Sequence, residues 1–268
     1  MSADILNSLK IFKRELTPAQ VVKKSREDRF MAREIIDGIF TDFVELHGDR
    51  LSGDDMSVIG GIAALNGQPV TIIVIDKGTD IHDKLSKRNG SPEPWGYRKA
   101  QRLMQQAERF QRPIITFINT PGAFPGKEAE AQGQGEAIAK SILESMKLTV
   151  PMIAIVYGEG GSGGALALAT ANQVWMFQNA TYSILSPEGF ASILWKDSKR
   201  SDEAAAVMGL TAKDLFEKDI IEYIVPESHN HPRVFNLIRK RLDDEIKALN
   251  QLTPSELVKQ RRARFRAF

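Results

Sequence analysis

A glycine-rich turn in the middle of the chain carries residue types that could do chemistry. Residues 158–164 read Gly-Glu-Gly-Gly-Ser-Gly-Gly, with an apolar β-branched run before them and an Ala/Leu run after them. This order predicts a strand, a tight turn and the first turn of a helix. The first N–H groups of a helix have no partner within it, and without side chains around them they can approach a negatively charged oxygen. The segment therefore predicts an oxyanion hole.

Three interpretations of this turn compete. Residues 160–164 match the G-x-S-x-G pattern of a nucleophile elbow, which would make Ser162 the nucleophile of a serine hydrolase and His229 or His231 its base. In the second interpretation the backbone N–H groups do the chemistry, and Ser162 merely tolerates the turn. The third is close packing of a helix against a sheet, which also favours glycine. Five glycines in seven residues are more than packing usually requires, so we rank this explanation last.

Length and composition limit the possible functions. The chain has 268 residues, of which 42% are hydrophobic, enough for one large domain with helical appendages. A net charge of +2 gives no argument for nucleic-acid binding, and the absence of cysteine excludes disulfides, a thiolate nucleophile and Cys-ligated metals. No apolar run approaches membrane-spanning length, and residues 1–7 lack the order of a signal peptide. We expect a cytoplasmic protein without membrane or nucleic-acid partners.

The spacing of apolar residues alternates between helix and strand periods along the chain. Thr17-Pro18 predicts a helix start, and residues 30–46 carry apolar residues at helical spacing. Asn66-Gly67, between two β-branched runs, predicts a hairpin with a type I′ turn. Further strands are predicted at 113–118, 151–156, 173–177, 182–185 and 220–225, and further helices at 97–110, 135–146, 203–208, 232–249 and 254–264. One α/β domain flanked by terminal helices is the simplest account.

Two loops at the carboxyl ends of predicted strands could contribute to a site. Residues 119–126 hold two Pro/Gly pairs, which stiffen a loop and bring its backbone close to whatever lies above the sheet, although a plain strand-to-helix connection explains them equally well. Residues 186–188 resemble a helix start, and we favour a capping Ser186 and a dipole-compensating Glu188 over direct catalysis. The apolar residues 193–195 suit a subunit interface as well as a core.

Seven basic residues gather between residues 77 and 102. They are Lys77, Lys84, Lys87, Arg88, Arg98, Lys99 and Arg102. A solvated helix face is the default explanation. A phosphate-bearing ligand or an acidic partner is the alternative, strengthened because Glu93 is the only acid between residues 84 and 102.

Five blocks of the sequence, taken in order, resemble the carboxyltransferase alpha subunit of bacterial acetyl-CoA carboxylase. They are residues 58–63, 96–100, 113–118, 158–167 and 182–196, and the resemblance runs from about Phe30 to the C-terminus. It implies an α/β fold of the crotonase-like (ClpP-like) kind, built of repeated ββα units with flanking N- and C-terminal helices. We accordingly divide the chain into an N-terminal helical segment (1–29), a crotonase-like carboxyltransferase domain (30–250) and a C-terminal helix with a basic tail (251–268).

The resemblance implies that a carboxyl group moves from carboxybiotin, held on the biotin carboxyl carrier protein, to acetyl-CoA, giving malonyl-CoA for fatty acid synthesis. Negative charge then develops on the acetyl-CoA enolate and on the ureido oxygen of biotin, so two oxyanion holes are needed and no nucleophile. In the family, the N–H groups that match Gly163 and Gly164 are assigned to the ureido oxygen. The further residues expected to contact substrate are Gly122, Phe124, Pro125, Gly126, Gly160, Gly161, Glu188 and Gly189.

The same resemblance implies protein partners. A separate beta subunit with a zinc ribbon would supply the second oxyanion hole and most contacts to CoA, in a heterotetramer of two alpha and two beta chains. Biotin carboxyl carrier protein and biotin carboxylase are the other expected partners, and no metal is expected in this chain. Five positions depart from the family pattern: Asn119 replaces Asp, Phe124 replaces Tyr, Glu128 replaces Gly, Gln132 replaces Arg and Gly135 replaces Ser. A catalytically silent paralogue that only binds a partner is therefore a third hypothesis.

Overall fold

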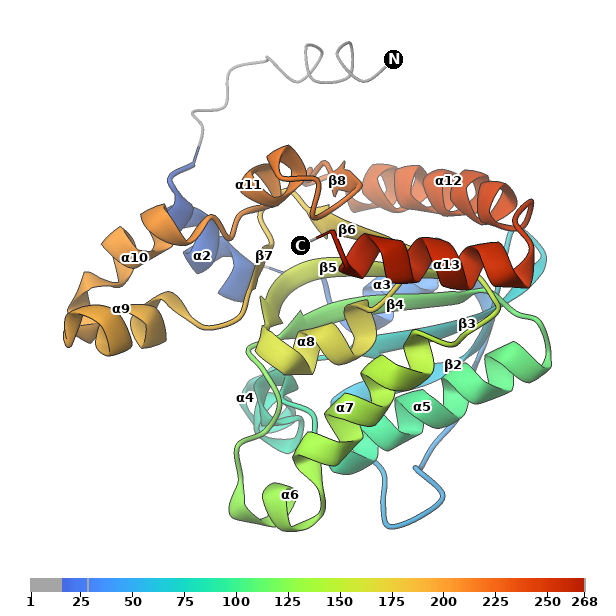
Figure 1. The fold of residues 1–268 in the computed structure, drawn as a ribbon, viewed down its shortest axis with the longest axis horizontal. Coiled ribbons are helices and arrows are strands. Elements are labelled where there is room, and N and C mark those ends of the chain that lie inside the picture. Colours follow the sequence, from blue (N-terminus) through green and yellow to red (C-terminus); the bar gives the residue numbers. More distant parts are fainter. Residues whose placement is uncertain (1–15, 28, 268) are drawn as a thin grey trace.

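One mixed β-sheet forms the centre of the molecule (Figure 1). The structure, a computed structural model, describes residues 16–27 and 29–267. Within them the strand order is β1-β2-β3-β4-β5-β6-β8, and β7 pairs with the end of β5. The strands are β1 (Thr41–Glu45), β2 (Val58–Leu65), β3 (Gln68–Ile75), β4 (Ile114–Thr120), β5 (Met152–Gly161), β6 (Gln173–Phe177), β7 (Thr181–Ser183) and β8 (Tyr223–Val225).

The first three strands form an antiparallel meander, and the remaining neighbours run parallel. Asn66 and Gly67 join β2 to β3, with φ angles of 49° and 82°. Both angles are positive, as a type I′ turn requires, and Leu65 and Gln68 form the last strand pair before the turn. The hairpin prediction is therefore confirmed.

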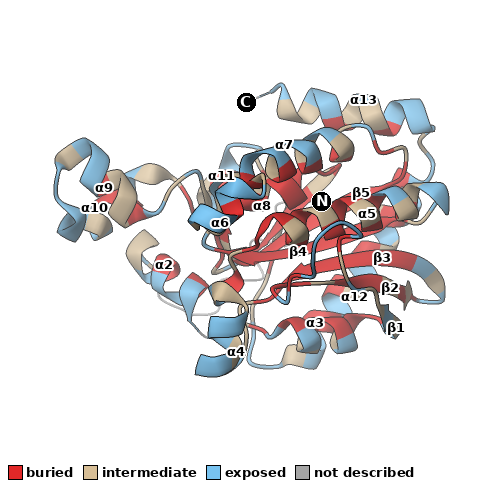
Figure 2. Cartoon of the chain, turned by 90° about the horizontal axis from the view of Figure 1, so that it is seen from below, coloured by how far each residue is buried: buried red, intermediate tan, exposed pale blue. Residues whose placement is uncertain are grey.

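Helices cover both faces of the sheet, as Figure 2 shows. On one face lie α5 (Pro94–Arg109), α7 (Gln134–Ser145) and α8 (Ser162–Ala169), and on the other lie α3 (Ala32–Ile39) and α12 (His231–Leu249). The other described helices are α2 (Pro18–Arg26), α4 (Ile81–Ser86), α6 (Lys127–Ala131), α9 (Pro187–Trp195), α10 (Ser201–Met208), α11 (Ala212–Glu217) and α13 (Pro254–Phe265), with short 3₁₀ turns η1 (Arg88–Gly90) and η2 (Ser198–Arg200).

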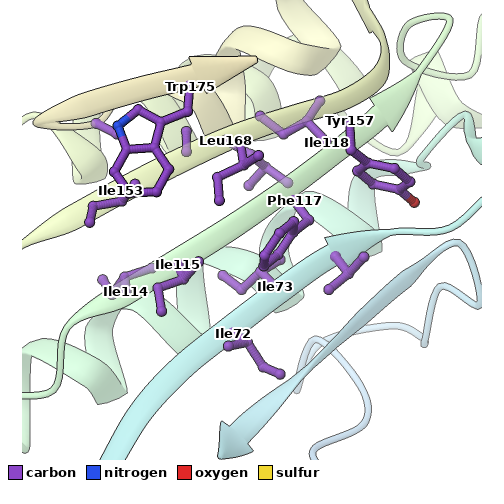
Figure 3. Close-up of a cluster of buried hydrophobic side chains, with 14 of the residues drawn as sticks. Ile72, Ile73, Ile114, Ile115, Phe117, Ile118, Ile153, Tyr157, Leu168 and Trp175 are labelled. Atoms are coloured by element: carbon purple, nitrogen blue, oxygen red, sulfur yellow. The ribbon is translucent and has the colours of Figure 1, made fainter. Parts of the chain in front are cut away.

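The core is aliphatic, with a few aromatic rings between the layers (Figure 3). Every residue of β4 is buried, and Ile114, Ile115 and Phe117 of this strand lie among isoleucines of β3 and β5. Because helices cover both faces, the inner strands read as continuous apolar runs rather than as alternating patterns. This is why the inner strands can be recognised in the sequence.

Helices α9 and α10 extend away from the sheet as an arm, which we define as residues 184–208 (Figures 1 and 2). Helix α2 lies between the arm and the end of β5, and Val22 of α2 packs against Ala205 of α10 and Leu210. Thr17 caps α2 through a reciprocal capping box with Gln20, as its Thr-Pro start predicts. Residues 1–15 of the predicted helical segment lie outside the described residues.

One predicted element is wrong. The helix expected over residues 30–46 ends at Ile39, and residues 41–45 form the edge strand β1 instead. Phe40 already has extended backbone angles, and Thr41 and Val44 pair with β2 on either side of an irregularity at Asp42. Pairing with the free edge of β2 supplies backbone hydrogen bonds that the local apolar spacing cannot reveal, and it overrides that spacing.

The C-terminal helix belongs to the same body as the sheet. Arg261 of α13 is completely buried and donates hydrogen bonds to the carbonyls of Ser145, Leu148 and Val150 and to Asn172 Oδ1. Arg264 pairs with Glu222 at 2.7 Å. Two of the arginines that make the C-terminus look like a basic tail therefore hold the fold together.

Candidate active site at the start of helix α8

The predicted strand, turn and helix are present around the glycine-rich segment. Strand β5 lies between β4 and β6, and its last three residues also pair with β7. Helix α8 begins at Ser162 with Gly161 as its N-cap residue, so the cap offers no side-chain acceptor to the first N–H groups. These donors therefore remain for a ligand.

Close packing explains four of the five glycines, although we ranked that explanation last. A β-carbon at Gly158, Gly160, Gly161 or Gly164 would lie 2.2 to 2.8 Å from a neighbouring atom. At Gly161 and Gly164 those neighbours include backbone atoms of the loop after β4, which cannot give way as a flexible side chain can. Gly161 and Gly164 therefore report how tightly this loop packs against the start of the helix, whereas Gly158 and Gly160 report packing against Asn119 and Tyr182.

Gly163 is the exception. Among the residues that the structure describes, a β-carbon there would meet only Ile138 of α7, at 3.5 Å, which is ordinary van der Waals contact. Its φ is not among the positive angles, so the backbone conformation does not require glycine either. The residue is half-buried between the exposed Ser162 and the buried Gly164. Glycine at position 163 leaves the helix start without a side chain there, and the packing of the fold does not require a glycine at this position.

A cleft of about 400 Å³ opens beside this helix start. Its lining comes from the end of β5, from α2, from the strand β7 and from the start of α9. Of the residues expected to contact substrate, Gly160, Gly161 and Glu188 line it, together with Ser162. The expected residues that do not line it are Gly122, Phe124, Pro125, Gly126, Gly163, Gly164 and Gly189.

Gly122 nevertheless belongs to the helix start. Its backbone lies 2.8 Å from the position that a β-carbon on Gly161 would take, and 2.9 Å from the corresponding position on Gly164. Its φ of 140° is open only to glycine in practice, and its N–H donates to Thr120 Oγ1 at 3.0 Å. This turn brings the loop after β4 against α8.

The second half of that loop turns away from the cleft. The Phe124 N–H donates to the Pro92 carbonyl at 3.0 Å, and the Arg88 guanidinium lies over the Phe124 ring at 4.9 Å. Gly126 fits against the same ring, because a β-carbon there would lie 2.3 Å from it. Gly189 has a capping role, since its N–H donates to Ser186 Oγ at 3.1 Å. The structure thus does not bring Phe124, Gly126 or Gly189 into the cleft.

Four charged side chains form a chain of ion pairs along the cleft, which we call the charge quartet. Arg26 of α2 binds Glu159 at 2.9 Å and Glu188 at 2.7 and 3.0 Å, and Lys77 binds the second oxygen of Glu159. Hydrogen bonds from Arg26 hold the pKa of Glu188 at about 2, below its usual value of 4.5. Burial lowers the pKa of Lys77 despite the carboxylate beside it. The quartet therefore places two basic and two acidic side chains in direct contact along the cleft.

Sequence reasoning missed Arg26 and did not foresee the partner of Lys77. Arg26 and Glu188 are 162 residues apart, and Lys77 and Glu159 are 82 residues apart. Charged residues at such separations carry no pairing signal in a single sequence. The position of Glu159 inside the glycine-rich turn was the one available hint.

The basic residues between 77 and 102 are largely neutralised inside the fold. Most of their acidic partners come from outside that segment. The scarcity of acidic residues between residues 84 and 102 therefore does not indicate a phosphate-bearing ligand or an acidic partner. The pairs are Lys77 with Glu159, Lys87 with Asp76, Arg88 with Glu93, Arg98 with Asp49 and Lys99 with Asp54. Arg102 donates instead to the carbonyls of His47 and Gly48. Lys84 is exposed and carries no such pair within the described part of the chain.

A serine hydrolase would need a base beside Ser162. The φ of Ser162 is 50°, which fits the sharp turn of a nucleophile elbow. However, no histidine is among the described residues that line the cleft, and none of their side chains hydrogen-bonds to the Ser162 hydroxyl. His231 pairs with Glu34 and packs on the ring of Phe30, at the start of α12. The hydrolase interpretation is therefore not supported.

The departures from the family pattern leave the helix start in place. Buried Asn119 accepts the Glu159 N–H at 3.0 Å through its side-chain oxygen, and it packs against Gly158. The Gln132 carbonyl accepts a hydrogen bond from Arg98 at 3.0 Å. Glu128 is exposed, and a β-carbon on Gly135 would meet open space. All four positions are accommodated in a fold in which α8 begins at Ser162.

Two features are absent from the described residues. Residues 16–27 and 29–267 contain no group of three His, Cys, Asp or Glu side chains placed to hold a metal ion. None of the helices in that part of the chain is both long enough and apolar enough to cross a membrane.

Comparison with known proteins identifies close relatives. The family described as acetyl co-enzyme A carboxylase carboxyltransferase-like matches residues 3–268. The acetyl-coenzyme A carboxylase carboxyl transferase subunit alpha of Streptococcus equi subsp. zooepidemicus is 53% identical over 252 residues, which are 93% of this chain and 98% of the relative. The protein of the same name from Streptococcus sanguinis is 50% identical over 251 residues, with the same coverage.

Solved structures share the fold at low sequence identity. A transcarboxylase 12S structure with methylmalonyl-coenzyme A bound matches with a TM-score of 0.72 and 18% identity, over 87% of this chain and 44% of that chain. A Pseudomonas malonate decarboxylase hetero-tetramer in complex with coenzyme A matches with a TM-score of 0.65 and 18% identity, over 78% and 86% of the two chains. The crotonase-like fold implied by the sequence is confirmed. The chain therefore belongs to the acetyl co-enzyme A carboxylase carboxyltransferase-like family.

Proposed function

We propose that this chain is the alpha subunit of an acetyl-CoA carboxylase carboxyltransferase and that the start of α8 stabilises the ureido oxygen of biotin during transfer. Family membership supports carboxyl transfer as the reaction, and the curated relatives carry the name of that subunit. The observation that carries the site assignment is Gly163, where glycine leaves the helix start bare although neither packing nor φ demands it.

The chemistry needs donors that are in place before charge develops. In the transfer, the bond between the biotin nitrogen and the carboxyl carbon breaks, a C–C bond forms at the methyl carbon of acetyl-CoA, and the methyl proton passes to biotin. The N–H groups of Gly163 and Gly164 point out of the positive end of an eight-residue helix, which favours a developing negative charge. Backbone donors of this kind need no reorganisation as the oxyanion forms.

The charge quartet reduces the repulsion that an anionic substrate would meet in the cleft. Glu159 and Glu188 both line the cleft beside the helix start, and as isolated carboxylates they would repel the carboxylate of carboxybiotin. Arg26 and Lys77 pair with them and cancel their charge. The helix dipole can then act on the substrate without an opposing net charge at the cleft wall.

The proposed site is half of what the reaction needs. Within the described part of the chain, α8 is the one helix whose first turn is rich in glycine, whereas two oxyanions form and CoA must also be held. We therefore propose that a zinc-containing beta subunit supplies the second oxyanion hole and the CoA site. Biotin carboxyl carrier protein would deliver carboxybiotin, and biotin carboxylase would charge it.

Reconstitution tests this proposal. The purified chain alone should show no decarboxylation of malonyl-CoA with free biotin as acceptor, which is the reverse reaction. Activity should appear when a beta-type subunit is added, together with a heteromer detectable by size-exclusion chromatography with light scattering. Robust turnover by the isolated chain would contradict the proposal, and a heteromer that forms but stays inactive would favour the silent paralogue.

A further inference from the structure

One buried hydroxyl near the proposed site has no hydrogen-bond partner. Tyr97 of α5 is 1% exposed, and its Oη is one of only three buried side-chain polar atoms in residues 16–27 and 29–267 without a partner. A buried hydroxyl that forgoes a hydrogen bond destabilises the fold, so native proteins retain such groups rarely. Tyr97 calls for an explanation that the resting fold does not provide.

The hydroxyl lies directly beneath the start of α8. Its oxygen is 2.8 Å from the point where a β-carbon on Gly164 would stand, and the Ala123 nitrogen is 2.5 Å from the same point. The tyrosine ring itself is in an apolar cluster with Ala137 of α7 and Ala167 of α8. The Tyr97 hydroxyl therefore lies close to the backbone that carries the proposed oxyanion donors.

The surrounding contacts hold Tyr97 in this position. At the start of α5, the Glu93 N–H donates to Asp55 Oδ2 at 2.7 Å, and four residues after Tyr97 the Gln101 side chain donates to the Ala137 carbonyl of α7 at 2.8 Å. Burial raises the pKa of the Tyr97 hydroxyl, so the group stays protonated. The Tyr97 side chain is therefore held in one place, with a protonated hydroxyl.

We propose that Tyr97 is a positioning residue for carboxyl transfer: its hydroxyl sets the position of the Gly163 and Gly164 N–H groups and gains a hydrogen-bond partner at the helix start only when an anion is bound. This inference rests on the proposed function of α8. Removing the hydroxyl leaves a gap under Gly164, and a helix start that can shift by tenths of an ångström loses preorganisation. The rate should suffer more than substrate binding.

The test compares Tyr97→Phe with Tyr157→Phe in the complex with the beta subunit. Tyr157 is equally buried, but its hydroxyl donates to the Ile75 carbonyl at 2.7 Å, so it is the matched control. We expect Tyr97→Phe to lower kcat at least tenfold, to leave the KM for malonyl-CoA within twofold, and to leave Tm equal or higher. Tyr157→Phe should do the reverse, with a lower Tm and kcat within twofold.

A second measurement does not depend on activity. In the isolated chain, amide hydrogen exchange of residues 162–165 should become at least fivefold faster in Tyr97→Phe and should stay unchanged in Tyr157→Phe. An inactive wild-type complex would count against the proposed function, and the exchange rates would then decide this inference alone. A kcat within twofold of wild type, a loss of kcat that accompanies a lower Tm, or unchanged exchange at 162–165 would each overturn it.

Discussion

Arg26 and Glu188 join helix α2 to the start of the arm through two nitrogen–oxygen contacts of 2.7 and 3.0 Å. The same guanidinium donates to Glu159 at the end of β5, at 2.9 Å. One side chain thus connects the N-terminal helix, the arm and the strand that leads into the proposed oxyanion hole. Together with the packing of Val22 against Ala205, this residue connects the arm to the strand before that hole.

The Arg26–Glu188 pair should give a defined pH dependence. Arg26 holds the pKa of Glu188 at about 2, below the usual 4.5, so the stabilisation is complete above the usual value and is lost as pH falls towards 2. Both side chains are more than one third exposed, so solvent screening limits the effect to about 1 kcal/mol or less. The difference in melting temperature between wild type and Glu188→Gln should therefore be the same at pH 7 and pH 5. It should disappear as the pH falls from 4.5 to 2.

Glu136→Gln is the control for this series, because among the described residues Glu136 pairs only with Lys140 of its own helix, at 3.5 Å. It should leave the melting temperature nearly unchanged at every pH. If Glu188→Gln melts like wild type at pH 7, the pair does not hold the arm.

Gly163→Ala separates catalysis from stability. The added methyl group meets Ile138 at 3.5 Å, an ordinary contact, so the chain should fold, and replacing a helical glycine should stabilise it by up to about 1 kcal/mol. The methyl group would nevertheless stand next to the N–H donors. We expect carboxyl transfer by the assembled complex to fall at least tenfold while Tm stays equal or rises.

Gly135→Ala is the matched substitution, since a β-carbon there meets no described atom within 4 Å and Gly135 also lies in a helix. It should keep full activity with a similar or higher Tm. Equal activity of the two variants would place the oxyanion site elsewhere. Gly164 is a poorer probe, because a β-carbon there would lie 2.5 Å from the Ala123 nitrogen and would disturb folding.

Ser162→Ala tests the hydrolase alternative. The hydroxyl has no role in a hole built from N–H groups, so the variant should retain most carboxyltransferase activity. Mass spectrometry should find no acylation of the wild-type chain by a serine-directed reagent. Loss of transfer in the variant, together with labelling of Ser162 in the wild type, would establish a nucleophilic serine.

The arm is our candidate for part of the contact with the beta subunit. Ile193 and Leu194 of α9 are 59% and 60% exposed, and exposed apolar side chains near a site often mark an interface. Leu194→Arg should weaken assembly with the beta subunit by tenfold or more, as measured by analytical ultracentrifugation, without lowering the Tm of the isolated chain. Leu143→Arg is the control, since Leu143 of α7 is 53% exposed and lies outside the arm. If both variants assembled equally well with the beta subunit, the arm would not be part of the interface.

Local patterns were sufficient to predict the elements around the site. The β2–β3 hairpin follows from Asn66-Gly67, and the strand, turn and helix around residue 162 follow from a β-branched run, glycines and an Ala/Leu run. The resemblance to the carboxyltransferase alpha subunit also rests on contiguous blocks of sequence. Such signals can be recognised because the residues that form them are close neighbours in the chain.

The tertiary structure alone decided what each residue of the site does. It shows that Gly164 serves packing whereas Gly163 does not, that Arg26 pairs with Glu188 from 162 residues away, and that the Tyr97 hydroxyl lies close to the start of α8 without a hydrogen-bond partner among the described residues. It also shows that residues 41–45 form an edge strand, although their apolar side chains have helical spacing. These features depend on contacts between distant segments, and such contacts arise only when the sheet and its helices come together.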